Sequence, residues 1–184
     1  MGDLESVQNK LGTIKTQIES LYAKAMRYAP DVHFTIISDH GMTPLTGTAD
    51  IISAVEDTGL VFGKDYGVCY DSTMARFYYL NENAKTVIGE KMSRFPGHFL
   101  TEDDEKNYGI FRSDRLFGDA VFLLDAGIQI VPSDMGDHPL NGMHGFAPED
   151  EHSFAAVLSN TAIPEYVNNV KDYYKFMIER AEKL

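Results

Sequence analysis

Two short segments combine metal-binding side chains with glycines that let the backbone turn. The first is Ser-Asp-His-Gly-Met at 38–42, which directly follows an apolar, β-branched run at 32–37. Asp39 and His40 offer one oxygen and one nitrogen donor, the ligand types that zinc takes. Neighbouring strand residues point to opposite faces of a sheet, so both donors reach one ion only if the chain turns, and Gly41 gives that freedom. An isolated Asp-His pair, however, is more often a helix cap beside a loop histidine.

The second segment is Gly-Met-His-Gly-Phe at 142–146, which precedes another apolar run at 154–158. His144 offers a nitrogen donor in a glycine-rich loop. A histidine between glycines is, on its own, more often a solvated loop residue. Both segments lie next to expected core strands, and ligands of open α/β sheets gather at the carboxyl ends of strands.

Beyond their donor chemistry, these segments resemble known sequence motifs. Ile-Ile-Ser-Asp-His-Gly-Met at 36–42 closely resembles the strand-end metal motif of nucleotide pyrophosphatases, type I phosphodiesterases and other members of the alkaline phosphatase superfamily. Segment 142–146 resembles their His-Gly-aromatic element, and Asp-Ser-Thr-Met-Ala-Arg-Phe at 71–77 is similar to a segment between those motifs in bacterial and archaeal members. The resemblance implies that Asp39 and His40 bind one of two catalytic metal ions and that His144 binds the other.

Ligand counting sets a limit on this site. A catalytic zinc takes about three protein ligands, so a two-metal site needs roughly six. The chain supplies three, and the resemblance, which runs from about Leu11 to Asn160, covers only the later portion of a full-length member. It implies that the nucleophilic Thr or Ser and the other ligands lie upstream, so no catalytic residue is assigned in this chain. The hydroxyl residues near the motifs are expected to cap, turn or pair strands; they are Ser38, Thr43, Ser72 and Thr73.

Other polar residues have weaker functional interpretations. Arg76 could hold a phosphate oxygen, but a strand arginine more often extends to the surface. His138, six residues before His144 in a flexible loop, is the best remaining candidate for a substrate contact. The other histidines are expected to be structural or solvated; they are His33, His98 and His152.

Periodicity predicts the elements that position these residues. Helices are expected at 4–25, 48–58, 83–94 and 167–181, and a surface loop or turn of helix at 101–107. Strands are expected at 32–37, where the run is typical of a strand buried on both faces, and at 67–70, 75–80 and 154–158. The runs 120–124 and 128–131 flank Asp-Ala-Gly, which predicts a hairpin.

The order of these elements predicts an α/β fold. We expect a mainly parallel sheet flanked by helices, with a small antiparallel hairpin or cap-like subregion. By the resemblance this is an alkaline phosphatase-like partial fold, forming a single domain over 1–184 with a cap-like insertion at about 66–132.

The first helix leaves two interpretations open. Its apolar residues recur at alternating steps of three and four, which fits packing on a sheet and also fits the heptad seam of a helix pair between chains. Because strands follow at once, packing on a sheet is favoured. The residues of this stripe are Leu4, Val7, Leu11, Ile14, Ile18, Leu21 and Ala25.

Composition excludes several classes of function. The chain carries 28 acidic and 16 basic residues, and its net charge of -12 repels the phosphate backbone of nucleic acids. A small phosphorylated substrate remains compatible, because bound divalent ions reverse the local field. No apolar run approaches the roughly 20 residues of a membrane helix, and no secretory signal is evident, so a cytoplasmic location without a membrane partner is expected. Cys69, as the single cysteine, is expected in the core.

Together these features predict part of a metal-dependent phosphodiesterase or phosphatase that is inactive alone. The family uses two divalent ions, for which mixed histidine and carboxylate ligands suit zinc and also permit manganese. The alternative is a non-catalytic binding or self-assembly module that forms a homo-oligomer. A third hypothesis, hydrolysis at a reduced one-metal site, is disfavoured because no activated nucleophile can be named.

Overall fold

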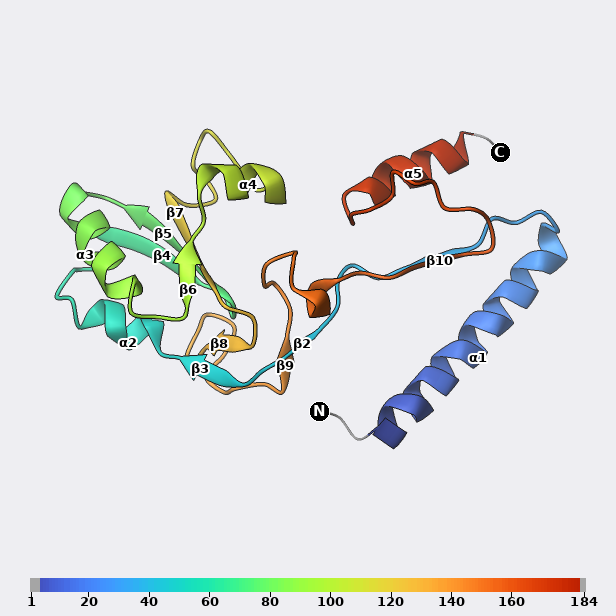
Figure 1. Cartoon of the computed structure of the whole chain (residues 1–184), viewed down its shortest axis with the longest axis horizontal. Coiled ribbons are helices and arrows are strands. Elements are labelled where there is room, and N and C mark those ends of the chain that lie inside the picture. The colour runs from blue at the N-terminus through green and yellow to red at the C-terminus, as the bar shows by residue number, and fades with distance from the viewer. Residues whose placement is uncertain (1–3, 183–184) are drawn as a thin grey trace. The chain divides into compact units, whose positions relative to one another are not determined.

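The computed structural model describes residues 4–182, which fall into two compact units. The first unit combines the residues up to His40 with those from Ala155 onward, and the second is Gly41–Phe154. The units are described separately below, with elements labelled as in Figure 1. Within residues 4–182, no helix is both long and apolar enough to cross a bilayer.

The first unit stacks two helices on the two faces of a two-stranded antiparallel sheet. Side chains of the first strand alternate between these faces: Phe34 and Ile36 turn toward the first helix, while Thr35 and Ile37 turn toward the last. This alternation is the period-two pattern of a strand. The elements are α1 (Leu4–Tyr28), β1 (Thr35–Ile37), β10 (Val157–Ser159) and α5 (Asp172–Ala181).

Of two predictions for this unit, one is confirmed and one is wrong. The long first helix is confirmed, and it ends at Tyr28, just before Ala-Pro. The strand buried on both faces is wrong, because β1 is only three residues long and Ile37 is 43% exposed. In the described part of the chain β1 pairs with β10 alone, and the helices cover this narrow sheet only in part.

The second unit holds nearly all of the buried core. Its strands β4, β5, β7 and β6 form an antiparallel sheet in that order, and two helices add apolar side chains to the same core as Phe77 and Phe122. The predicted strands at 67–70 and 75–80 and the helix at 83–94 are confirmed within one or two residues. The elements are α2 (Ile51–Glu56), β4 (Tyr66–Tyr70), β5 (Met74–Tyr79), α3 (Glu82–Met92), β6 (Gly97–Phe99), α4 (Glu102–Tyr108) and β7 (Ala120–Leu124).

The predicted hairpin is wrong. Strand β7 pairs with β5 and β6, whereas β8 (Ile128–Ile130) pairs in parallel with β3 (Gly47–Ala49). Gly127 has a positive φ of 93° and its carbonyl accepts from the backbone of Thr46 and Gly47, so the turn directs the chain away from β7. Because 47–49 is a strand, α2 begins at Ile51 with Asp50 as its N-cap, later than predicted.

The α/β class and the antiparallel subregion are confirmed, but the mainly parallel sheet is not. Among the described residues, β3 and β8 form the one parallel pair of strands, apart from an isolated parallel bridge between Phe62 and Tyr66. The remaining strand pairs are antiparallel, including β2 (Thr43–Pro44) with β9 (Gly142–Met143), which lies inside the glycine-rich loop expected around His144. Helix α5 begins at Asp172, so 167–171 lies outside it. Cys69 is partly buried in β4.

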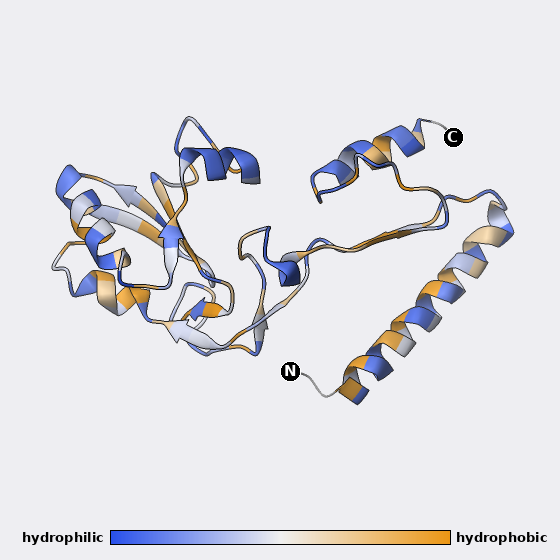
Figure 2. Ribbon diagram, viewed as in Figure 1, coloured by the Kyte–Doolittle hydropathy of each residue, from blue (hydrophilic) through white to orange (hydrophobic). Residues whose placement is uncertain are grey.

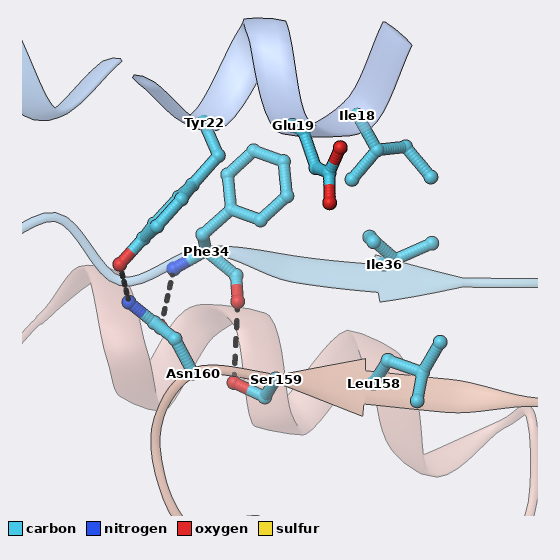
Figure 3. A pocket seen from close by; sticks show the side chains of 8 residues that line it. All are labelled: Ile18, Glu19, Tyr22, Phe34, Ile36, Leu158, Ser159 and Asn160. Carbon is cyan, nitrogen blue, oxygen red and sulfur yellow. Dashed lines mark hydrogen bonds between the residues drawn. The ribbon is translucent and has the colours of Figure 1, made fainter. Parts of the chain in front are cut away.

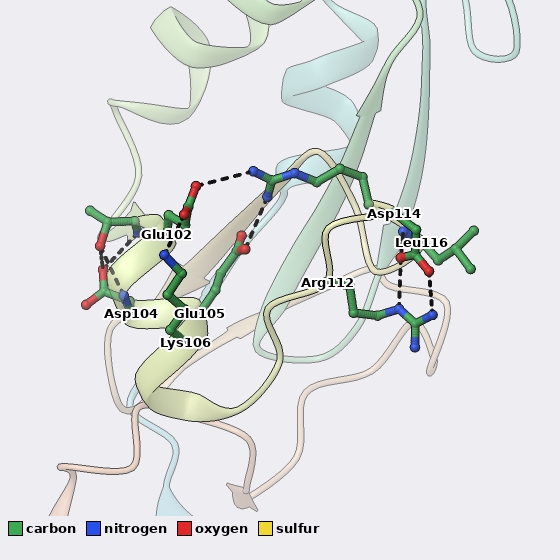
Figure 4. Close-up of polar contacts among 9 residues, drawn as sticks. Glu102, Asp104, Glu105, Lys106, Arg112, Asp114 and Leu116 are labelled. Carbon is green, nitrogen blue, oxygen red and sulfur yellow. Dashed lines mark hydrogen bonds and ion pairs between the residues drawn. The ribbon is translucent and has the colours of Figure 1, made fainter.

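The polar stretch at 101–107 contains a capped helix, α4. Thr101 and Asp104 form a reciprocal capping box at its start (Figure 4), which explains how so acidic a segment holds a helix. The buried Glu105 accepts from Arg115 at 3.2 Å, and this ties α4 to the following loop. Earlier in that loop, a two-pronged bond from Arg112 lowers the pKa of Asp114 to about 2.

Candidate metal centre

Strand β1 places Asp39 and His40 at its carboxyl end. Ser38 closes the pairing with the neighbouring chain, because its N-H donates to the Ala156 carbonyl at 2.9 Å and its Oγ accepts from Ala156 N-H at 2.7 Å. The backbone bends at Asp39, directly after this contact. The hydrogen bonds of Ser38 therefore fix the end of the strand, and the two candidate ligands follow directly after it.

The structure brings the side chains of Asp39 and His40 together. Asp39 Oδ1 accepts from the backbone N-H of His40 at 3.0 Å, and Oδ2 lies 3.3 Å from His40 Nε2. The aspartate thus folds back on its own chain, which overcomes the opposite orientation of neighbouring strand residues. The Asp39 side chain is 83% exposed and that of His40 is 35% exposed, so the carboxylate remains accessible to an ion.

Gly41 is required for a reason other than the predicted one. Its φ is not among the positive values of the chain, so the turn itself does not demand glycine. Instead, a Cβ at this position would lie 2.1 Å from the carbonyl oxygen of His152, and the Gly41 N-H donates to the Ser153 carbonyl at 3.1 Å. The short helix η1 (Glu151–Ser153) therefore packs directly against Gly41.

The residues that follow the first motif pair with those that precede His144. In the β2–β9 ladder, Thr43 is opposite Met143 and Pro44 is opposite Gly142. Thr43 is buried and its hydroxyl donates to Asp150 Oδ2 at 2.6 Å. Two segments about a hundred residues apart in sequence are thus held side by side within the second unit.

The third motif segment, 71–77, contacts the second through Thr73. The Thr73 hydroxyl is buried and donates to the carbonyl of Gly145, the residue after His144, at 2.8 Å. Gly145 has a φ of 91°, and a Cβ there would lie 2.9 Å from Thr73 Oγ1. Glycine is needed here for both its conformation and its small size. The expected structural role of Thr73 is consistent with this bond, but its partner was not predicted.

His144 itself is exposed and lies in the second unit, whereas Asp39 and His40 belong to the first. Among residues 4–182, no group of three or more His, Cys, Asp or Glu side chains is arranged to hold a metal ion. The structure thus assembles two of the three predicted ligands into a pair.

The remaining candidates have structural contacts. Arg76 forms an ion pair with Asp71 at 3.1 Å and lies over the Phe117 ring at 4.8 Å, which favours a structural role. His138 is 87% exposed beside Asp137, with 3.4 Å between Nε2 and Oδ1. His152 Nε2 lies 3.8 Å from Oε1 of the adjacent Glu151.

The bond between Thr73 and Gly145 gives a prediction. The change Thr73→Val keeps the side-chain shape but leaves the Gly145 carbonyl without its hydroxyl donor, so the free energy of unfolding should fall by about 1–2 kcal/mol. Thr73→Ser, which retains the hydroxyl, should lower the free energy of unfolding clearly less. Urea unfolding followed by tyrosine fluorescence measures both, and equal losses in the two variants would contradict the role given to this bond.

Comparison with known proteins identifies the fold. No protein-family model and no curated protein sequence matches the chain. Among solved structures, murine ectonucleotide pyrophosphatase / phosphodiesterase 5 aligns over 95% of this chain with a TM-score of 0.65 and 18% identity, and the human protein over 92% with 0.63 and 15%. Phosphonoacetate hydrolase from Sinorhizobium meliloti 1021 aligns over 81% with 0.60 and 14%. All belong to the alkaline phosphatase superfamily.

The chain has an alkaline phosphatase-like fold. It is a partial one, since the chain spans only 46–47% of the two ectonucleotide pyrophosphatase / phosphodiesterase chains and 42% of the phosphonoacetate hydrolase chain. At such low identities the likeness establishes the fold and not the activity. Within this alkaline phosphatase-like fold, the segments 38–42, 71–77 and 142–146 are the three whose sequences resemble the family's motifs.

Proposed function

We propose that the chain is part of a metal-dependent phosphoric ester or diester hydrolase. In this proposal Asp39 and His40 hold one divalent ion and His144 helps to hold a second. The observation that carries it lies in the second unit, where the Thr73 hydroxyl of segment 71–77 bonds to the Gly145 carbonyl of segment 142–146, and where β2, directly after the first motif, pairs with β9. Segments 71–77 and 142–146, which both resemble parts of one family's site, thus share a direct contact.

The donor chemistry of the first pair fits a metal ion. Two ligands bound at about 2.1 Å to one tetrahedral zinc stand about 3.4 Å apart, and Asp39 Oδ2 and His40 Nε2 are 3.3 Å apart. The pair makes up only part of a coordination sphere, because about three protein ligands are usual. A bound pair of ions would stabilise charge on a phosphoryl group and activate water.

We further propose that the nucleophile and the other ligands lie on polypeptide outside this chain, which spans about half the length of the solved chains it matches. Small phosphorylated molecules are the proposed substrates. The murine relative is in complex with AMP and the bacterial relative with phosphonoacetate, both small anions. Zinc is the proposed metal, with manganese as the alternative.

This proposal predicts that the chain alone shows no appreciable turnover of a chromogenic phosphodiester, with or without added zinc or manganese. The physical reason is that an activated nucleophile and about half of the ligands are absent. The assay uses the purified chain and an Asp39→Ala variant. Metal-dependent turnover that disappears in Asp39→Ala would contradict the inactive state of the isolated chain.

A second candidate function, a self-assembly module, is favoured by one observation. The apolar stripe of α1 is largely exposed.

A further inference from the structure

The N-terminal half of α1 has an uncovered apolar face. Every residue from 4 to 17 is exposed, while the C-terminal half packs through Ile18 and Tyr22 toward β1. Figure 2 shows apolar and polar residues alternating along the helix. The exposed fractions along the stripe are 71% for Leu4, 46% for Val7, 59% for Leu11, 39% for Ile14 and 58% for Leu21.

This half-helix has little reason to be helical on its own. It contains Gly12 in its interior and β-branched residues such as Thr13 and Ile14, which lower helix propensity. Isolated helices of about 12–15 residues are marginal in water even with better sequences. The half-helix therefore needs a surface that buries its apolar side chains.

An apolar groove continues the stripe into the packed half of the helix. It has a volume of about 240 Å³ and lies between α1 and the sheet (Figure 3). Side chains from a second helix lying along the stripe would enter this groove. Its apolar lining comes from Ile18, Tyr22, Phe34, Ile36 and Leu158.

The spacing of the stripe fits a partner helix with the same repeat. From Leu4 the apolar residues keep a strict alternation of three and four residues up to Leu21, which is the a/d seam of a two-helix coiled coil. The flanking e and g positions decide the orientation. They hold lysine and glutamine along the bare half: Gln8, Lys10, Lys15 and Gln17.

In a parallel pair, Lys10 of one helix would face Lys15 of the other, and the like charges would repel. In an antiparallel pair centred between Gly12 and Thr13, Lys10 faces Gln17 and Lys15 faces Gln8. No like-charge contact remains. The lysine positions therefore favour the antiparallel orientation, in which two copies of α1 are complementary to each other.

We propose that α1 docks antiparallel on α1 of a second copy of this chain. Leu4 of one copy then lies opposite Leu21 of the other, Val7 opposite Ile18, and Leu11 opposite Ile14. The first turns of each helix cover the groove beside the packed half of its partner.

Sedimentation velocity tests the docking. The chain should sediment as a dimer at about 50 µM, and Leu11→Glu with Ile14→Glu should weaken dimerisation at least ~100-fold, because unpaired charges would be buried in the seam. Asn9→Glu with Thr16→Glu is the matched control, since it adds the same charge on the opposite face and should leave the dimer intact. A monomeric wild type, or a dimer that the seam variant retains, overturns the proposal.

Disulfide trapping tests the orientation and does not depend on how well the charged variant folds. In a Cys69→Ser background, a mixture of Leu4→Cys and Leu21→Cys chains should cross-link in high yield under mild oxidation, while each alone should not. Self-linking of either single variant would indicate parallel helices. That result, or no linking in the mixture, contradicts the antiparallel pair.

Discussion

Replacing Gly41 with alanine should lower the free energy of unfolding of the second unit by about 3 kcal/mol or more. The added Cβ would stand 2.1 Å from the His152 carbonyl oxygen and 3.0 Å from the Phe154 carbonyl oxygen. Both obstacles are backbone atoms, so no side-chain rotation relieves the overlap. The β2–β9 ladder or η1 must shift, and the contact that orders the chain after His40 is lost.

Gly89→Ala is the matched control for Gly41→Ala. Gly89 lies inside α3, and a Cβ there meets nothing within 4 Å. The same chemical change should therefore stabilise the unit by about 0.5–1 kcal/mol, through the gain in helix propensity. Urea denaturation of both variants gives the comparison. Equal stability of Gly41→Ala and the wild type would show that the close approach at His152 is not a constraint.

The second large effect concerns metal binding at Asp39. Removing its carboxylate in Asp39→Ala takes away one of two adjacent donors and leaves His40 alone at the end of β1. Losing a residue that merely orients a ligand already costs 10–100-fold in metal affinity, so losing a direct ligand should cost at least ~100-fold. Asp31→Ala, an exposed aspartate of the same unit, should leave the affinity unchanged.

Local patterns predicted the elements whose partners lie nearby in sequence. Strand β4 pairs along its whole length with β5 across a short turn, and α3 carries an N-cap at Asn81. The false hairpin shows where such patterns fail. The runs at 120–124 and 128–131 look alike, but β8 pairs with β3, and the Gly127 carbonyl accepts from the N-H groups of Thr46 and Gly47, about eighty residues away in sequence.

The candidate site, too, could be predicted from the sequence only in part. Asp39, His40 and His144 could be predicted as ligands because their residue types and neighbouring glycines are local features of the sequence. It could not show that Thr43 pairs with Met143 or that Thr73 bonds to Gly145, since two-residue strands and single hydroxyl bonds have no periodicity. The need for Gly41 was predicted with the wrong cause, because the approach of η1 is a tertiary contact.

A zinc titration by isothermal calorimetry tests the proposed site most directly. The wild-type chain should bind zinc weakly, because water must complete a coordination sphere that lacks protein ligands. Asp39→Ala should abolish most of that binding, and Asp31→Ala should not. Tight binding of two zinc ions by the chain alone, or a titration that Asp39→Ala leaves unchanged, would contradict the assignment of Asp39 and His40 as part of an incomplete two-metal site.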